Sequence, residues 1–249
     1  MFNFNQYNQN NNFSFASQEA QAIAVPKTFI ANVFSWMAVA LGITAFFAYY
    51  FSTNEAFISS LITQTEKGVG MSGLGWVVML APLAFVLVMS FGFNKLSAGL
   101  LTLLFVAFSF IMGMSLSFIF IVYTGTSIFL TFAVTAGTFG VMAIAGYTTN
   151  IDLSKFGSIM FMGLIGVIIA SLVNMFMKNP MLDWIISVAG VLVFTGLTAW
   201  DVQKLKRIGA SVESGTDPAK KLVIMGALTL YLDFINLFLF MLRFLGNRK

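Results

Sequence analysis

The stretch Leu222–Leu242, LVIMGALTLYLDFINLFLFML, contains a single charged residue, Asp233, near its middle. At ~1.5 Å per residue, such a stretch crosses a bilayer core of roughly 30 Å. A carboxylate at that depth costs ~3 kcal/mol or more, so ionisable residues within spans face the bundle interior and mark ion or proton sites. The stretch therefore predicts a membrane-spanning helix with a functional carboxyl group at its centre.

The remaining sequence has the composition of an integral membrane protein. Of its 249 residues, 59% are hydrophobic and 9% are charged, whereas soluble domains carry about 25% charged residues. Continuous apolar runs, without alternating strands, indicate helical spans. The net charge of +4 bears on the orientation of the chain in the membrane more than on nucleic-acid binding. No nucleic-acid partner is expected. The chain has no Cys and no His, so a proton switch near neutral pH must use carboxyl groups.

Seven apolar runs of spanning length follow one another along the chain. They are Phe29–Phe51, Leu74–Phe91, Ser97–Val122, Ile128–Gly146, Gly157–Met177, Leu182–Trp200 and Leu222–Leu242. The predicted fold is an all-α integral membrane protein, with one seven-helix domain over residues 25–249. Residues 1–24, rich in Asn and Gln, are predicted to be a disordered polar tail. Between the first two spans, one helical face predicts a short helix on the membrane surface, formed by Phe57, Ile58, Leu61 and Ile62.

The distribution of basic residues predicts the orientation of the chain. Seven spans place the termini on opposite sides of the membrane. The side of the amino terminus collects Lys27, Lys95, Lys155, Lys204, Lys206, Arg207, Lys220 and Lys221. The other side collects Lys67, Lys178, Arg243, Arg248 and Lys249. The positive-inside rule therefore favours a cytoplasmic amino terminus, with the basic carboxyl-terminal end as a contrary signal.

A second acidic residue, Asp201, lies next to the sixth span. The sixth helix is expected to run on through TAWDVQKLKRIG, with Asp201 at its carboxyl-terminal end. Spans six and seven are joined by a short loop and should be antiparallel neighbours. Asp233 lies about 16 Å deep on ideal helix geometry, so contact requires Asp201 to lie deeper than the predicted boundary. The polar residues expected to support the pair are Thr198, Thr229 and Asn236, the last two on the helical face of Asp233.

Two carboxyl groups in a poorly hydrated site cannot both ionise cheaply. They would share a proton and titrate together, which allows pH sensing without His. The residues alone leave an alternative open for Asp201, which could cap its helix or pair with Lys204 or Lys206 at the interface. No comparably simple structural role exists for Asp233.

Four stretches resemble the Bax inhibitor-1 family, in the bacterial YccA-like branch of the transmembrane BAX-inhibitor-motif proteins. They are GYTTNIDLSKFG (146–157), LIGVIIASLVNMF (164–176), FTGLTAWDVQKLK (194–206) and ALTLYLDFINLFLFMLRFLG (227–246). The similarity runs from about Phe29 to Gly246, and the last two stretches are the most specific. The resemblance implies a seven-helix bundle whose seventh helix is central, in the plasma (inner) membrane of a bacterium.

The resemblance also implies an activity, a pH-regulated calcium leak with Asp201 and Asp233 as its sensor. Family members also use a basic residue of the second helix, but this chain has no Lys or Arg between Lys67 and Lys95. Calcium takes six to eight oxygen ligands, so the aspartate pair would hold it only weakly and transiently. No cofactor is expected, Ca²⁺ is the candidate permeant ion, and the expected partners are the lipid bilayer, calcium ions and protons.

Three other functions compete with a leak. An intramembrane aspartyl protease also uses two aspartates, but its second aspartate follows Gly-x-Gly, whereas LYL precedes Asp233 and TAW precedes Asp201. The chain is therefore not expected to be an enzyme. A proton-coupled transporter would use Asp233 as a relay. A non-catalytic regulator would bind other membrane proteins, such as a membrane protease, through the polar tail.

Overall fold

The computed structural model describes the backbone of residues 4–65, 68–213 and 215–249, and the side chains of residues 27–63, 70–213 and 215–249. Its elements are α1 (Phe4–Ser52), α2 (Glu55–Leu61), β1 (Ile62–Thr65), β2 (Gly68–Met71), α3 (Gly73–Gly92), α4 (Ala98–Leu116), α5 (Ile119–Val122), α6 (Gly125–Thr148), α7 (Ser154–Met177), α8 (Pro180–Ser211) and α9 (Asp217–Leu245). Seven helical segments of the described chain are long and apolar enough to cross a membrane. The predicted all-α seven-span fold is confirmed.

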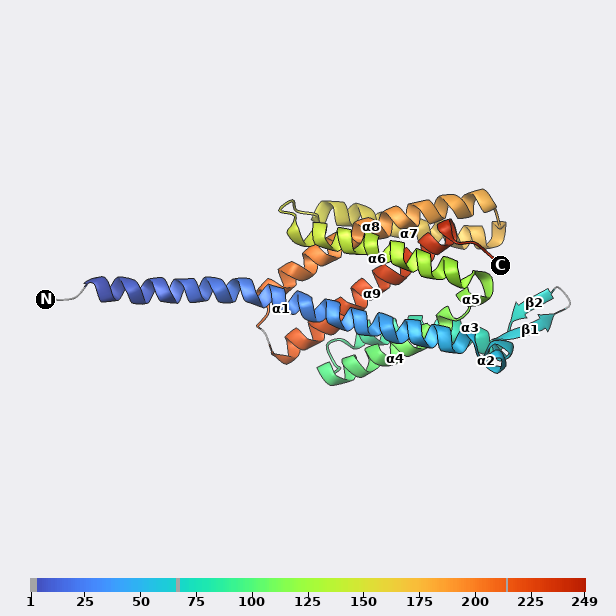
Figure 1. Cartoon of the computed structure of the whole chain (residues 1–249), viewed down its shortest axis with the longest axis horizontal. Coiled ribbons are helices and arrows are strands. Elements are labelled where there is room, and N and C mark those ends of the chain that lie inside the picture. Colours follow the sequence, from blue (N-terminus) through green and yellow to red (C-terminus); the bar gives the residue numbers. More distant parts are fainter. Residues whose placement is uncertain (1–3, 66–67, 214) are drawn as a thin grey trace.

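The last two spans form the centre of the bundle. Figure 1 shows α6, α7 and α8 on one side and α1, α3 and α4 on the other, with α9 running obliquely between them. Helix α9 packs against α8, α1, α6 and α4. In the most apolar segment of α9, 67% of the residues are buried, and in that of α8 61% are buried. The corresponding share is 33% or less in each of the other spans. The central position of the seventh span is confirmed, and α8 shares it.

Polar caps start most of the spans. The hydroxyl of Ser72 accepts a hydrogen bond from the Gly75 amide, and Ser97, Thr124 and Thr216 cap α4, α6 and α9 in the same way. Each cap satisfies one of the free amides of a first helical turn. These short polar residues, set directly before apolar runs, define where the helices begin.

The structure differs from the sequence-based prediction at three places. The third span is interrupted at Ser117, whose amide is shared between the carbonyls of Gly113 and Met114, so α4 ends and the short α5 follows. The predicted surface helix is present as α2, but Ile62 begins an antiparallel hairpin of β1 and β2. Ile62, Thr63 and Thr65 are β-branched, which favours the extended chain.

The amino-terminal stretch is the third difference. In the structure α1 begins at Phe4 and extends away from the bundle (Figure 1), in the region for which the composition predicts a disordered tail. The part of this stretch nearest the bundle, QEAQAIAV, is rich in Ala, Gln and Glu, which favour a helix. The apolar segment that can span the membrane starts at Lys27.

Candidate functional site

Helix α8 carries Asp201 well inside the bundle. The helix starts at Pro180, where the Oδ1 atom of Asn179 accepts hydrogen bonds from the amides of Met181 and Leu182. It then runs without interruption to Ser211, so Asp201 lies well before its end. The prediction that the sixth helix runs on through TAWDVQKLKRIG is confirmed, but Asp201 lies well before the end of the helix at Ser211 and not at its carboxyl-terminal end.

Two glycines bring the neighbouring helices against α8 beside Asp201. A Cβ atom at Gly146 of α6 would overlap the backbone carbonyl of Ala199, and one at Gly157 of α7 would overlap the ring of Trp200. The absence of a side chain allows these close approaches. The α8 backbone next to Asp201 is therefore held from two sides.

The structure brings Asp201 and Asp233 together. Only 7% of Asp201 and 6% of Asp233 is exposed, and the two carboxyl groups lie close enough to interact directly. The Oδ2 atom of Asp233 is buried and has no hydrogen-bond partner in the described part of the chain. The site is thus a carboxyl pair between the two central helices.

The basic residues considered as alternative partners of Asp201 take different positions. The positive charge of Lys204 acts on Asp201, while its Nζ atom lies 5.1 Å from the centroid of the Trp200 ring. Lys206 donates a hydrogen bond of 2.8 Å to the Tyr147 carbonyl instead. Within the described residues, neither lysine forms an ion pair with Asp201. Lys204 is therefore a nearby charge that acts on Asp201 from the same helix.

The three polar residues predicted to support the pair form hydrogen bonds along their own helices. Thr198 donates to the Phe194 carbonyl at 2.7 Å, and Thr229 donates to the Met225 carbonyl at 3.0 Å. Asn236 donates to the Leu232 carbonyl at 2.8 Å. No hydrogen bond from these three to either aspartate is present in the described part of the chain. Bonding to a carbonyl one turn earlier satisfies a buried hydroxyl without a partner on another helix.

A cavity of about 590 Å³ adjoins Asp233. It lies between α7 and α9, and Thr229 and Asn236 line it together with Asp233. Most of its other lining residues are apolar, among them Leu172 of α7 and Phe240 of α9. The supporting residues thus share a cavity with Asp233, although they do not bind it directly.

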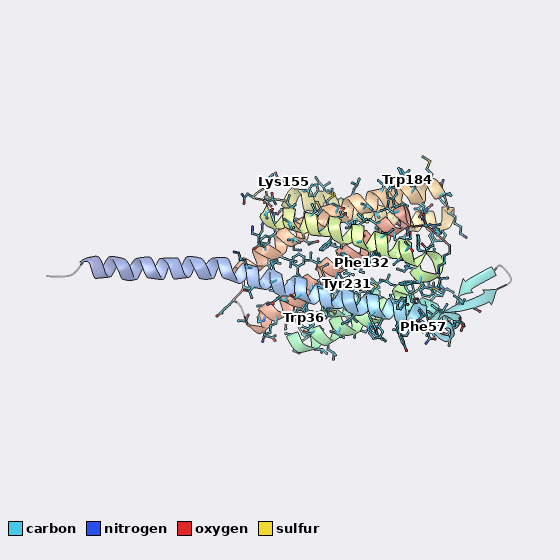
Figure 2. The ribbon with its side chains drawn as sticks, viewed as in Figure 1. Trp36, Phe57, Phe132, Lys155, Trp184 and Tyr231 are labelled. Carbon is cyan, nitrogen blue, oxygen red and sulfur yellow. The ribbon has the colours of Figure 1, made fainter. Side chains whose placement is uncertain are left out.

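A buried hydroxyl network, not predicted from the sequence, fixes the opposite face of α9. The hydroxyl of Tyr231 lies 2.7 Å from Oγ1 of Thr44, and Thr44 donates to the Ser109 carbonyl at 2.9 Å. Figure 2 shows Tyr231 in the middle of the bundle. The network links α1, α4 and α9. A tyrosine in an apolar span signals a buried hydroxyl that needs a partner, but it does not indicate which helix provides it.

A second polar network ties the loop between α6 and α7 to the end of α8. Arg207 Nη2 lies 2.6 Å from Asp152 Oδ1, and the side chain of Gln203 accepts from the Leu153 amide and donates to the Ile151 carbonyl. The hydrogen bond from Arg207 is the largest of the interactions that hold the pKa of Asp152 well below its usual range. This network anchors the α8 segment that follows Asp201.

The acidic groups offer few ligands for a tightly bound metal. In the described part of the chain, no group of three or more His, Cys, Asp and Glu side chains lies close enough to hold a metal ion. Asp201 and Asp233 therefore provide two carboxyl groups, short of the six to eight oxygens that Ca²⁺ takes.

Comparisons with known proteins cover nearly the whole chain. The family model described as Bax1-I, inhibitor of apoptosis-promoting Bax1, matches residues 26–249. The inner membrane protein YbhL of Escherichia coli (strain K12) is 49% identical over 224 residues, 90% of this chain and 93% of that protein. An uncharacterized protein of Borreliella burgdorferi is 42% identical, over 94% of this chain and 97% of its own length. An uncharacterized membrane protein of Streptococcus pyogenes serotype M1 is 35% identical, over 88% and 92%.

Proposed function

This chain belongs to the Bax inhibitor-1 family of membrane proteins, and on that premise we propose that it is a pH-sensitive calcium leak, not an enzyme. In this proposal Asp201 and Asp233 form the gate. The relative YbhL is an inner membrane protein, and the same membrane is proposed here, with the amino terminus in the cytoplasm as the positive-inside rule favours.

The observation that carries the proposal is the contact between the two buried carboxyl groups. Two carboxyl groups in contact in a poorly hydrated site cannot both ionise cheaply, so in this proposal they share a proton. Loss of that proton would leave two negative charges in contact in a poorly hydrated site. Repulsion would then favour separation of α8 from α9 at this level, or entry of a cation. The protonation of one pair is thereby coupled to the packing of the two central helices.

Weak coordination is compatible with a leak. An ion that passes through a pathway must be attracted strongly enough to enter and weakly enough to leave. Two carboxyl groups, with the side-chain oxygens of Thr229 and Asn236 on the adjoining cavity, provide attraction without a complete cage. Calcium is proposed as a transient occupant and protons as the regulator.

A proton-coupled transporter is the second candidate. The cavity of about 590 Å³ beside Asp233 favours it, because a small substrate could bind next to a carboxyl group that takes up and releases a proton. The two candidates differ in what drives flux, since a leak needs only an ion gradient.

Calcium flux into liposomes that contain the purified protein, measured from pH 6 to pH 8, tests the proposal. Asp201→Asn and Asp233→Asn each keep a hydrogen-bonding side chain but cannot ionise, so either should flatten the pH dependence of flux. Asp217→Asn is the matched control, because Asp217 lies at the surface with its Oδ2 3.7 Å from Lys221 Nζ. Flux equal to that of empty liposomes in all four proteins would refute the leak. Proton movement that requires an added substrate would favour the transporter.

A further inference from the structure

A polar cavity of about 430 Å³ lies where α7 ends and α8 begins. Trp184, which lines it, lies at the opposite end of the bundle from Lys155 (Figure 2). Lys178, Arg243 and Arg248 line the same cavity. They come from the end of α7, the last turns of α9 and the segment that follows α9. Three basic side chains from three segments thus meet at one end of the bundle.

One carboxylate lies among these basic groups and leaves an excess of positive charge. Asp183 Oδ1 lies 3.4 Å from Arg243 Nη1, and Asp183 Oδ2 lies 3.8 Å from Arg248 Nη2. Lys178 forms no ion pair in the described part of the chain. Since Asn179 already accepts hydrogen bonds from the first free amides of α8, the basic side chains provide the attraction for an anion.

Backbone contacts hold Arg248 in place. Arg248 forms an isolated antiparallel bridge with Tyr123, and the neighbouring Asn247 amide donates to Ser127 Oγ at 2.8 Å. The Lys249 amide donates to the Val122 carbonyl at 2.9 Å. The carboxyl-terminal segment is thereby fixed against α5 and α6, so the cavity has a built wall on this side.

The polar cavity adjoins the apolar cavity between α7 and α9. On α7, Ser171 and Met175 line the apolar cavity, while Asn174 and Lys178 on the same helical face line the polar one. On α9 the guanidinium carbon of Arg243 lies 5.6 Å from the centroid of the Phe240 ring, which lines the apolar cavity. The two cavities therefore follow one another along both helices.

The apolar cavity opens toward the surroundings of the bundle. In the described chain α7 packs along α8 and makes no extensive contact with α9. Ile168, Leu172 and Met175 line the cavity and are each at least half exposed. In a membrane protein the surroundings at this depth are acyl chains. A chain from the bilayer can therefore enter this groove from the side.

We propose that the two cavities form one binding site for an anionic phospholipid. Its phosphate lies among Lys178, Arg243 and Arg248, and one acyl chain lies in the groove between α7 and α9. A free anion would use only the polar cavity. A zwitterionic lipid such as phosphatidylcholine also carries a phosphate, but its choline cation is repelled by the basic side chains, whereas an anionic phospholipid uses both cavities without this repulsion. Trp184 lines the polar cavity, and tryptophan is enriched at membrane–water interfaces.

Native mass spectrometry of the purified full chain, with dioleoyl phosphatidylglycerol or dioleoyl phosphatidylcholine, tests the charged half of the site. The wild-type protein should bind phosphatidylglycerol more tightly than phosphatidylcholine. Lys178→Gln should weaken phosphatidylglycerol binding about fivefold, as expected for one basic side chain at an anionic lipid surface, and should weaken phosphatidylcholine binding less, because the choline cation offsets the phosphate charge. Lys155→Gln, at the other end of the bundle, should change neither affinity.

A second variant tests the apolar half. Ser171→Phe places a ring in the groove and should weaken both lipids, while free glycerol phosphate should not displace phosphatidylglycerol. Three outcomes would each overturn the proposal. They are equal binding of both lipids by the wild type, equal phosphatidylglycerol affinities of Lys178→Gln and Lys155→Gln, and displacement of phosphatidylglycerol by glycerol phosphate. Lys178→Gln should keep the carboxyl-terminal end of α7 intact, because the backbone amide of residue 178 donates the hydrogen bond to the Asn174 carbonyl. An unchanged thermal midpoint of the variant would verify that the fold is kept.

Discussion

The carboxyl group of Asp201 on α8 lies next to that of Asp233 on α9, in the most buried part of the bundle. The two residues come from helices joined by a short loop, yet they meet well inside both helices and not near the connection. Hydrogen bonds to backbone carbonyls occupy the nearby Thr198, Thr229 and Asn236. The three polar residues therefore have hydrogen-bond partners other than the two carboxyl groups.

The first prediction concerns stability at the pair. At pH 8 the variant Asp233→Asn should have a thermal midpoint equal to or above that of the wild type, because an amide can still form hydrogen bonds and removes the cost of a buried charge. At pH 5 the two proteins should unfold at similar temperatures. Fluorescence-detected thermal unfolding in detergent measures both midpoints. A lower midpoint for the variant at both pH values would show that the carboxyl group is needed for packing, independent of its charge.

The second prediction separates the two members of the hydroxyl network. Tyr231→Phe removes one hydrogen bond and leaves Thr44 bonded to the Ser109 carbonyl, so it should cost about 1 kcal/mol. Thr44→Val leaves the buried Tyr231 hydroxyl without its partner and should cost about 1–3 kcal/mol. The double variant should cost less than the sum of the two, because no hydroxyl is then left unpaired. Denaturant unfolding of all four proteins measures the coupling, and strictly additive costs would contradict the network.

The third prediction tests the close approach of α6 to α8. Gly146→Ala places a methyl group against the Ala199 carbonyl, and overpacking of this kind costs about 1–3 kcal/mol. A Cβ atom added to Gly140 on the same helix would meet nothing within 4 Å, so Gly140→Ala is the matched control and should be neutral or slightly stabilising. The thermal midpoint of Gly146→Ala should therefore be lower than that of Gly140→Ala. Equal midpoints would show that α6 can shift away from α8 without cost.

The fourth prediction concerns pH and the polar network at the end of α8. The Arg207 hydrogen bond lowers the pKa of Asp152 in the folded protein, so this carboxylate contributes stability above its ordinary titration range, near pH 4. The contribution is lost as the pH falls through the lower pKa. Asp152→Asn should therefore lower the thermal midpoint slightly at pH 7, and the difference from wild type should shrink below pH 4. The effect is small because Asp152 is exposed and solvent screens its charge.

A double variant gives the control for this prediction. In an Arg207→Gln background, Asp152→Asn should have almost no further effect at pH 7, since the largest cause of the lowered pKa is absent. A full-sized effect of Asp152→Asn in that background would assign the stabilisation to the bond between Asp152 and the Ser154 amide instead.

The apolar pattern of the chain determined most of the fold. Hydropathy and helix length predicted the seven spans, because no other arrangement satisfies the backbone of such runs in a bilayer. The same reasoning singled out Asp233, since a lone charge in a span has few structural explanations. The hairpin of β1 and β2 was missed because its strands are short and lie outside the spans, where hydropathy carries little information.

Only the tertiary structure decided how the site is built. The sequence predicted that the sixth helix continues past Asp201, but the packing around Asp201 depends on the close approach of Gly146 to Ala199 and of Gly157 to Trp200, which involves helices distant in sequence. Periodicity places a residue on a face of its own helix but does not state which helix covers that face. Thr229 and Asn236 were correctly placed on the face of Asp233, and their hydrogen bonds to carbonyls are local to α9. The groove beside them became visible only when α7 and α9 were placed together.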